Sequence, residues 1–173
     1  MPEDWPDVEL ASFQQWFGPV VGSKAPTNAN YESFGIGLIA PLSRGEVTIK
    51  SGDMTDAPII TPNWLTHPTD QEIAVAAVRR AREYANTPAF QSIIIGDEAF
   101  PGSNVTSYDD ILRFLQKQAS TYYHASATCK MGKADDRMAV VDSKAKVIGV
   151  ERLRVVDVSA MPFLPPGQPQ ATV

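Results

Sequence analysis

Apolar residues recur at helical spacing in one long stretch of the chain, which begins at Thr69. There Thr69 and Glu72 have the spacing of a capping box, in which the threonine hydroxyl accepts a hydrogen bond from the Glu72 amide and the glutamate reaches back. The run Asn86-Thr87-Pro88 ends the pattern, because proline does not continue a helix. The pattern therefore predicts a helix that begins at Thr69 and ends before Asn86. Its expected buried face consists of Ile73, Ala77, Ala81 and Tyr84.

A second helical pattern is predicted to begin near Ser107. Asp109 and Asp110 fall in its first turn, where the helix dipole favours negative charge. This helix leads the chain directly to His124. Its expected buried residues are Ile111, Leu115 and Ala119.

The remaining apolar runs are short and predict strands. Residues 34–40 and 46–50 alternate in polarity on either side of a Pro-Leu-Ser-Arg-Gly turn, which is typical of an antiparallel pair. Beyond Gly132 the apolar residues are consecutive, which indicates strands covered on both faces. These residues are Val140, Val141, Val155 and Val156. Helices and strands together indicate an α+β fold.

Composition narrows the functional classes. The chain has 173 residues, the size of one domain, with a net charge of −5, so it offers no basic field for nucleic acid. Its single cysteine, Cys129, excludes an internal disulfide and, with only two histidines far apart, argues against a metal site. No run is long enough to span a membrane. The start has neither the basic nor the apolar region of an export signal, and the compartment stays open.

His124 is the strongest candidate for chemistry. It follows a predicted helix and precedes four small residues, 125–128, so its imidazole can face a cavity. A histidine there can take a proton from a substrate hydroxyl, and a hydrogen-bonded core histidine is the alternative. Ser126 with Asp142 or Asp157 would suit a hydrolase triad, but the chain has no G-x-S-x-G elbow.

The other candidates each have a plain structural interpretation. His67 precedes a proline outside a helix start and is expected to be a surface loop residue, and Cys129 is expected to be a buried thiol. Asp157 follows a valine-rich strand, where it can bind a hydroxyl or cap a loop. Residues 167–172 can present free amides at a helix start to an anionic group, or form an ordinary proline-rich connection.

Several of these stretches occur together in one known family. The stretch "YYHASATCKMG", followed by "AVVDSKAKVIGVERLRVVDVSAMPFLPPGQPQATV", closely resembles the C-terminal region of the glucose-methanol-choline (GMC) family of FAD-dependent oxidoreductases. In addition, "PLSRGEVTIKSGD" and "PIITPNWLTHPTD" resemble the sheet and loop of its substrate domain. The resemblance runs from about residue 6 to residue 173, and its motifs occur in the family's order.

The resemblance implies a part of a two-domain fold. Residues 1–122 would belong to the substrate domain, with its antiparallel sheet and helices. Residues 123–173 would be the C-terminal segment of a Rossmann-type FAD domain. The implied cofactor is FAD and the implied substrate a small alcohol, oxidised at a CH–OH group by hydride transfer to the flavin. No nucleic acid, metal or membrane partner is expected.

The resemblance also implies site residues. His124 matches the histidine that takes the alcohol proton, and Gln168 occupies the family's second active-site position. Tyr123 would lie close to the isoalloxazine ring, Asp157 and Val158 near the phosphate and ribityl chain, and the start of the last helix beneath the flavin pyrimidine. The expected FAD-binding set is Tyr123, Asp157, Val158, Gln168, Pro169, Gln170 and Thr172.

Three departures from the family pattern stand out. Gln168 replaces the usual His or Asn and cannot act as a base near neutral pH. Ala127 stands where many members have glycine, which matters if the turn needs a positive φ. The chain contains no G-x-G-x-x-G, so the pyrophosphate-binding half is expected in a missing N-terminal part. The chain is therefore interpreted as the C-terminal fragment of a flavoenzyme, from a truncated gene model or a partial sequence, and a natural short paralogue is the alternative.

Two alternatives remain beside alcohol oxidation. One is a non-redox relative that keeps FAD structurally, such as a hydroxynitrile lyase or a cyclase, for which Gln168 leaves room. The other is an inert module built from the retained substrate domain.

Overall fold

The structure is a computed structural model that describes residues 4–19, 23–27 and 29–169. Its contacts divide the chain into two compact units, each built from two segments. Unit 1 consists of Met1–Arg44 and Asn63–Ser120, and unit 2 of Gly45–Pro62 and Thr121–Val173. Helices and antiparallel strands occur together, so the expected α+β character is confirmed.

Unit 1 contains a two-stranded antiparallel sheet. Strand β1 (Val8–Phe13) pairs with β2 (Ser33–Leu38) in a register that places Val8 opposite Leu38. The predicted pairing of residues 34–40 with residues 46–50 is wrong, because the latter stretch holds β3 (Glu46–Thr48), which pairs with β4 (Ile59–Thr61). The Pro-Leu-Ser-Arg-Gly stretch does not close a hairpin, because the amides of Leu42 and Ser43 bind Asp70 in helix α1 (Pro68–Ala85) instead.

Helix α1 runs from Pro68 to Ala85, and its end before Asn86 is confirmed. Its start differs from the expected capping box. His67 is the N-cap, and its Nδ1 accepts a hydrogen bond from the Thr69 amide at 3.2 Å. Pro68 fits the first helical position because its fixed φ suits a helix and its missing N–H is not needed there. His67 is exposed, as expected, but it has a structural task.

Asp70 fixes the loop between β2 and β3 to the start of α1. Its side chain is only 1% exposed and accepts hydrogen bonds from the amides of Leu42 at 2.8 Å and Ser43 at 2.7 Å. The Ser43 hydroxyl also donates to Asp70 and accepts from the amides of Thr66 and His67. This buried carboxylate was not anticipated from the sequence.

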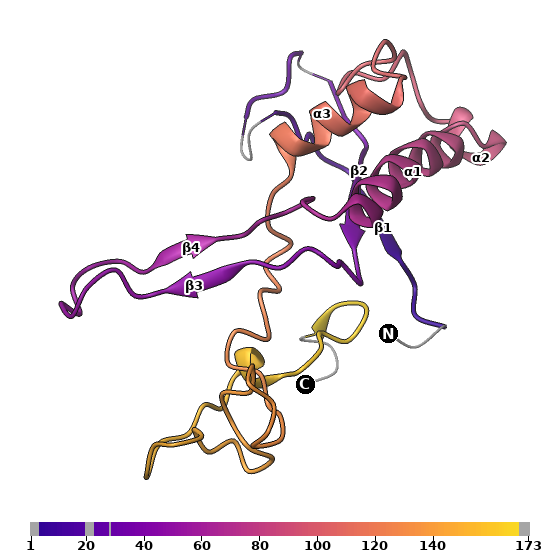
Figure 1. Cartoon of the computed structure of the whole chain (residues 1–173). Helices are drawn as coiled ribbons and strands as arrows, with labels where there is room; N and C mark the ends of the chain where they lie inside the picture. Colours follow the sequence, from indigo (N-terminus) through magenta and orange to yellow (C-terminus); the bar gives the residue numbers. More distant parts are fainter. Residues whose placement is uncertain (1–3, 20–22, 28, 170–173) are drawn as a thin grey trace. The chain divides into compact units, whose positions relative to one another are not determined.

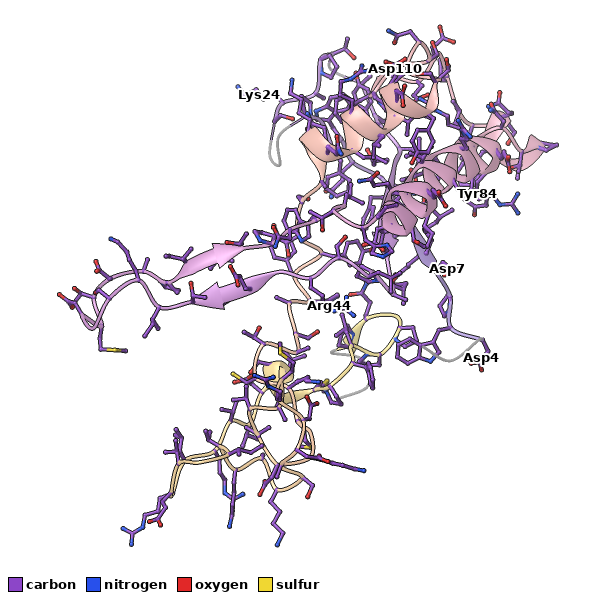
Figure 2. The ribbon with its side chains drawn as sticks, in the orientation of Figure 1. Asp4, Asp7, Lys24, Arg44, Tyr84 and Asp110 are labelled. Atoms are coloured by element: carbon purple, nitrogen blue, oxygen red, sulfur yellow. The ribbon has the colours of Figure 1, made fainter. Side chains whose placement is uncertain are left out.

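Helix α3 (Tyr108–Gln118) begins where predicted, since the Ser107 hydroxyl caps it by accepting from the Asp110 amide at 3.1 Å. Figure 2 labels Asp110 in this first turn. Ile111 is fully buried, whereas Ala119 is exposed at the C-cap, contrary to expectation. The α3 side of the core therefore centres on Ile111.

The core of unit 1 lies where α1 packs against α3 and against β2 (Figure 1). Val75, Val78 and Ile111 form its buried cluster. The expected α1 face is shifted: Ala77 and Ala81 are buried, but Tyr84 is 46% exposed. Figure 2 shows Tyr84 on α1, where its ring packs against Phe34 and Phe90. Phe90 lies on α2 (Pro88–Gln91), a short helix that the sequence pattern did not predict.

Arg82 ties the end of α1 to the loop before α3. Its guanidinium binds both carboxylate oxygens of Glu98, at 2.9 and 3.0 Å, and donates to the Val105 carbonyl at 2.7 Å. The two charged side chains are 23% and 28% exposed. Such a two-bond arginine–carboxylate contact fixes geometry better than a single-bond pair does.

Unit 2 contains the β3–β4 hairpin and a C-terminal stretch of turns. The valine-rich runs form only isolated bridges, which join Met131 with Val141 and Val141 with Val147. Val141 is fully buried, but Val156 is 81% exposed, so the prediction of strands covered on both faces is wrong. Turns interrupt each apolar run before a ladder can extend. A single 3-10 turn, η1 (Val158–Ala160), completes the described elements.

Candidate functional site

The site in unit 2 is built around His124 and Gln168, which the fold brings together across 44 residues of sequence. The imidazole Nε2 lies 2.8 Å from the amide oxygen Oε1 of Gln168. His124 is half-buried and Gln168 is exposed. The two residues assigned to catalysis from the sequence are therefore direct hydrogen-bond partners.

This hydrogen bond has a definite polarity. An amide oxygen only accepts, so a Gln168 oxygen that faces Nε2 requires the proton to reside on Nε2. If the amide turns over, its NH₂ group donates to an unprotonated Nε2 instead. Gln168 can therefore pair with His124 whether or not Nε2 carries a proton.

The backbone before His124 makes an unusual turn. Tyr123 has a φ of +63°, in the left-handed region, and its amide donates to the Thr121 hydroxyl at 2.8 Å. The Tyr122 ring contacts the imidazole edge to face, with ring centres 5.8 Å apart at 66°. The Tyr123 side chain itself is 79% exposed. Tyr122 thus packs against the imidazole of His124, whereas the ring of Tyr123 is exposed to solvent.

The backbone after His124 makes a second left-handed turn, at Ala127. Its φ is +65°, so the positive φ that the glycine of other members suggested is present here in an alanine. From Ala127 onward the chain runs beside the η1 segment. The Cys129 amide donates to the Ser159 carbonyl at 2.9 Å, and the Met131 amide to the Ala160 carbonyl at 2.8 Å. These hydrogen bonds hold the loop after His124 beside residues 158–160.

Asp157 precedes that segment and caps it. Its carboxylate accepts from the Ser159 amide at 2.8 Å. Hydrogen bonds from the Ser159 hydroxyl and amide hold the pKa of the Asp157 carboxyl below its usual range. Asp157 therefore stays anionic near neutral pH, and the loop-capping alternative describes its contact within the chain. Val158 is the first residue of η1.

The stretch that carries Gln168 also contains a left-handed residue, Gly167, with a φ of +85°. The next residue, Pro169, is buried, and it anchors the backbone beside the exposed amide. Gln170 and Thr172, which complete the expected FAD-binding set, lie outside the described residues. The described part of this set therefore ends at Pro169.

The remaining candidates do not join the site. Cys129 is half-buried as a free thiol, and His67 belongs to unit 1. Within the described ranges, no group of three or more His, Cys, Asp or Glu side chains is placed to hold a metal ion. None of the helices in the described part of the chain is long and apolar enough to cross a membrane.

Sequence reasoning missed Thr121, which contacts the backbone of the site. The signal was available, because a threonine two residues before a tight turn often accepts a backbone hydrogen bond from it. It was not recognised because the positive φ of a tyrosine is rare and leaves no mark in the sequence.

Comparison with known proteins places this arrangement in a family. A family model described as GMC oxidoreductase matches residues 41–173. Patulin synthase of Penicillium expansum is 51% identical over 99% of this chain, which spans 28% of that protein's length. Two solved structures share the fold. An FAD-dependent oxidoreductase from Chaetomium thermophilum is 34% identical with a TM-score of 0.73, over 82% of this chain and 24% of its own.

The second solved structure is a fungal aryl-alcohol oxidase. It is 33% identical with a TM-score of 0.69, over 86% of this chain and 24% of its own. The family model covers well over half of the sequence, and the patulin synthase match extends over nearly all of it. The chain belongs to the GMC oxidoreductase family.

Proposed function

We propose that the protein to which this chain belongs is an FAD-dependent oxidoreductase that oxidises a small alcohol at its CH–OH group. The observation that carries the proposal is the hydrogen bond between His124 and Gln168, at 2.8 Å, in a chain of this family. Two structural neighbours, an FAD-dependent oxidoreductase and a fungal aryl-alcohol oxidase, support it. The rest of the enzyme, including the pyrophosphate-binding half, would come from the part of the relatives that this chain does not span.

We assign residues 1–122 to the substrate domain and residues 123–173 to the C-terminal segment of the FAD domain. The passage of the chain from one compact unit to the other at Ser120–Thr121 supports a boundary in this region. Residues 45–62 group with unit 2, so for this hairpin the compact units and the proposed domains differ.

The side chains of Tyr123, His124 and Gln168 have the chemistry needed to bind a flavin with an alcohol beside it. Tyr123 offers an exposed aromatic face, and aromatic faces stack on planar rings. His124 supplies a proton acceptor, and the Gln168 amide lies within hydrogen-bond distance of it. We infer that Tyr123, Asp157, Val158, Gln168 and Pro169 contribute to holding FAD, together with Gln170 and Thr172. When bound, FAD would accept the hydride from the substrate carbon.

His124 is the proposed base. A neutral imidazole can take the hydroxyl proton, and its basicity near neutral pH suits this role. Once Nε2 carries a proton, the Gln168 oxygen can accept a hydrogen bond from that N–H, which is the contact that the structure contains. While Nε2 takes the proton, its lone pair must face the substrate hydroxyl, so at that stage the turned Gln168 amide would donate to the substrate oxygen. Gln168 therefore orients and stabilises, while proton abstraction falls to His124 alone.

The test is the rate of flavin reduction after anaerobic mixing of the full-length enzyme with an alcohol. His124→Ala should slow this step by about two to four orders of magnitude, the range for loss of a general base, with the flavin still bound. Gln168→Ala should cost less, about tenfold to a hundredfold, because it removes a hydrogen bond worth about 1–3 kcal/mol. A His124→Ala enzyme as fast as the parent would exclude His124 as the base.

A second candidate function is a non-redox lyase or cyclase that keeps FAD structurally. Gln168 favours it, because the second active-site position has no basic form. The same experiment separates the two functions. If FAD is bound but no alcohol in a broad panel reduces it, the non-redox function becomes the better proposal, and an enzyme that binds no FAD points to an inert module.

A further inference from the structure

Tyr123 holds a backbone conformation that its side chain disfavours. A φ of +63° is uncommon for any residue other than glycine, asparagine or aspartate, and rarer still for a bulky aromatic one. Such a conformation persists only where neighbouring contacts fix it. The structure contains one such contact at the Tyr123 backbone, the hydrogen bond from its amide to the Thr121 hydroxyl at 2.8 Å.

The turn at Tyr123 sets the direction in which His124 leaves the chain. Tyr122 and His124 flank the turn, and their rings meet edge to face at 5.8 Å. The imidazole also meets Gln168, at 2.8 Å. A change of the backbone angles at Tyr123 would swing His124 relative to both partners. Thr121 is therefore connected to His124 through a single strained residue.

We propose that Thr121 is a positioning residue for His124. Its hydroxyl holds Tyr123 in the left-handed conformation, and this conformation keeps Nε2 of His124 on the Gln168 amide. The role of Thr121 in catalysis rests on the proposed function, because it matters only if His124 takes the substrate proton. Thr121 itself touches neither the imidazole nor the Gln168 amide in the contacts described above. A displacement of about 1 Å in a reacting group can cost about a hundredfold in rate.

The variants are Thr121→Val, which keeps the shape and removes the hydrogen-bond acceptor, and Thr121→Ser, which keeps the acceptor. In the full-length flavoenzyme, Thr121→Val should slow flavin reduction at saturating alcohol by about tenfold to a hundredfold, with FAD content and apparent alcohol affinity unchanged. Thr121→Ser should stay within about threefold of the parent. Rescue by serine would show that the hydroxyl matters and not the bulk of the side chain.

A second pair of variants tests the route through Tyr123. Glycine adopts a positive φ without the steric cost, so Tyr123→Gly should remove the need for a hydroxyl at position 121. In the Tyr123→Gly background, Thr121→Val should therefore change the rate by less than about threefold. An effect as large as in the parent background would overturn the proposal, because Thr121 would then act by another route.

A spectroscopic measurement that does not depend on catalysis tests the positioning role of Thr121 separately from the proposed role of His124 as the base. In the full-length FAD-bound enzyme labelled with ¹⁵N-histidine, the signals of His124 and His67 are assigned by their loss in His124→Ala and His67→Asn, and His67 then serves as an internal control for folding. Thr121→Val should change the ¹⁵N shift of the His124 Nε2 and speed exchange of its proton with water, and leave His67 unchanged. Unchanged His124 signals would overturn the positioning role. Changed signals with a His124→Ala enzyme of parental rate would instead refute only the proposed base.

Discussion

Replacement of Asp70 by asparagine should destabilise unit 1 through its hydrogen bonds, without a change in side-chain size. The carboxylate accepts from two backbone amides, those of Leu42 and Ser43, and from the Ser43 hydroxyl. An asparagine offers one oxygen and one NH₂ group, and the NH₂ group would face a backbone N–H that it cannot satisfy. One buried donor without a partner costs about 1–3 kcal/mol, and this is the expected loss in the free energy of unfolding at pH 7.

The loss should depend on pH in a definite direction. Burial raises the pKa of Asp70, but the hydrogen bonds from Leu42 and Ser43, with the charge of His67, outweigh it and leave the pKa below its usual range. A depressed folded-state pKa gives stability that is complete above the unfolded pKa, about 3.9, and is lost as the pH falls through the folded value. The difference between parent and Asp70→Asn should therefore shrink below about pH 4.

Urea unfolding followed by circular dichroism, at pH 7 and at about pH 3, measures both effects. Glu72→Gln is the matched control, because Glu72 is exposed two residues further along the same helix and also carries a negative charge. It should change the free energy of unfolding by no more than about 0.5 kcal/mol. A cost of Asp70→Asn no larger than this control, or a cost that grows on acidification, would refute the hydrogen-bond account.

Two further predictions concern stability, both read from the same unfolding measurement. Ala127→Gly should raise the free energy of unfolding by up to about 1 kcal/mol, since the steric cost of a left-handed alanine exceeds the entropic cost of glycine. Ala125→Gly should lower it instead. Arg82→Met should cost about 1–3 kcal/mol because Glu98 and the Val105 carbonyl lose their donors, whereas Arg80→Met, in an exposed ion pair, should cost less than about 0.5.

Local patterns in the sequence were enough to find the helices of unit 1. The start of α3 at Ser107 and the end of α1 before Asn86 follow from capping and proline chemistry, which act within a few residues. The N-cap of α1 was placed two residues late, at Thr69 instead of His67, because a histidine cap before a proline competes with a nearby threonine. Such errors arise when two local signals overlap.

The strand pairing could not be predicted from local patterns. Residues 34–40 and 46–50 are adjacent in sequence and alternate as a hairpin would, but Asp70 binds the backbone between them. A contact between residues nearly thirty positions apart decides the topology here. The hydrogen bond of His124 with Gln168 is longer in range still, and only the resemblance to a family placed these residues together.

The division of unit 2 into two segments has a consequence for synthesis. Residues 45–62 leave the ribosome well before Thr121–Val173, the segment with which they form one unit. At about 5–20 residues per second, translation of residues 63–120 takes roughly 3–12 s. Unit 1 is completed only at the end of that interval, because it includes Asn63–Ser120. Until then the nascent hairpin displays Val47, Ile49, Met54, Ile59 and Ile60, residues that stay exposed even in the folded chain. A chaperone that binds extended apolar segments would find its target on the nascent chain within this interval.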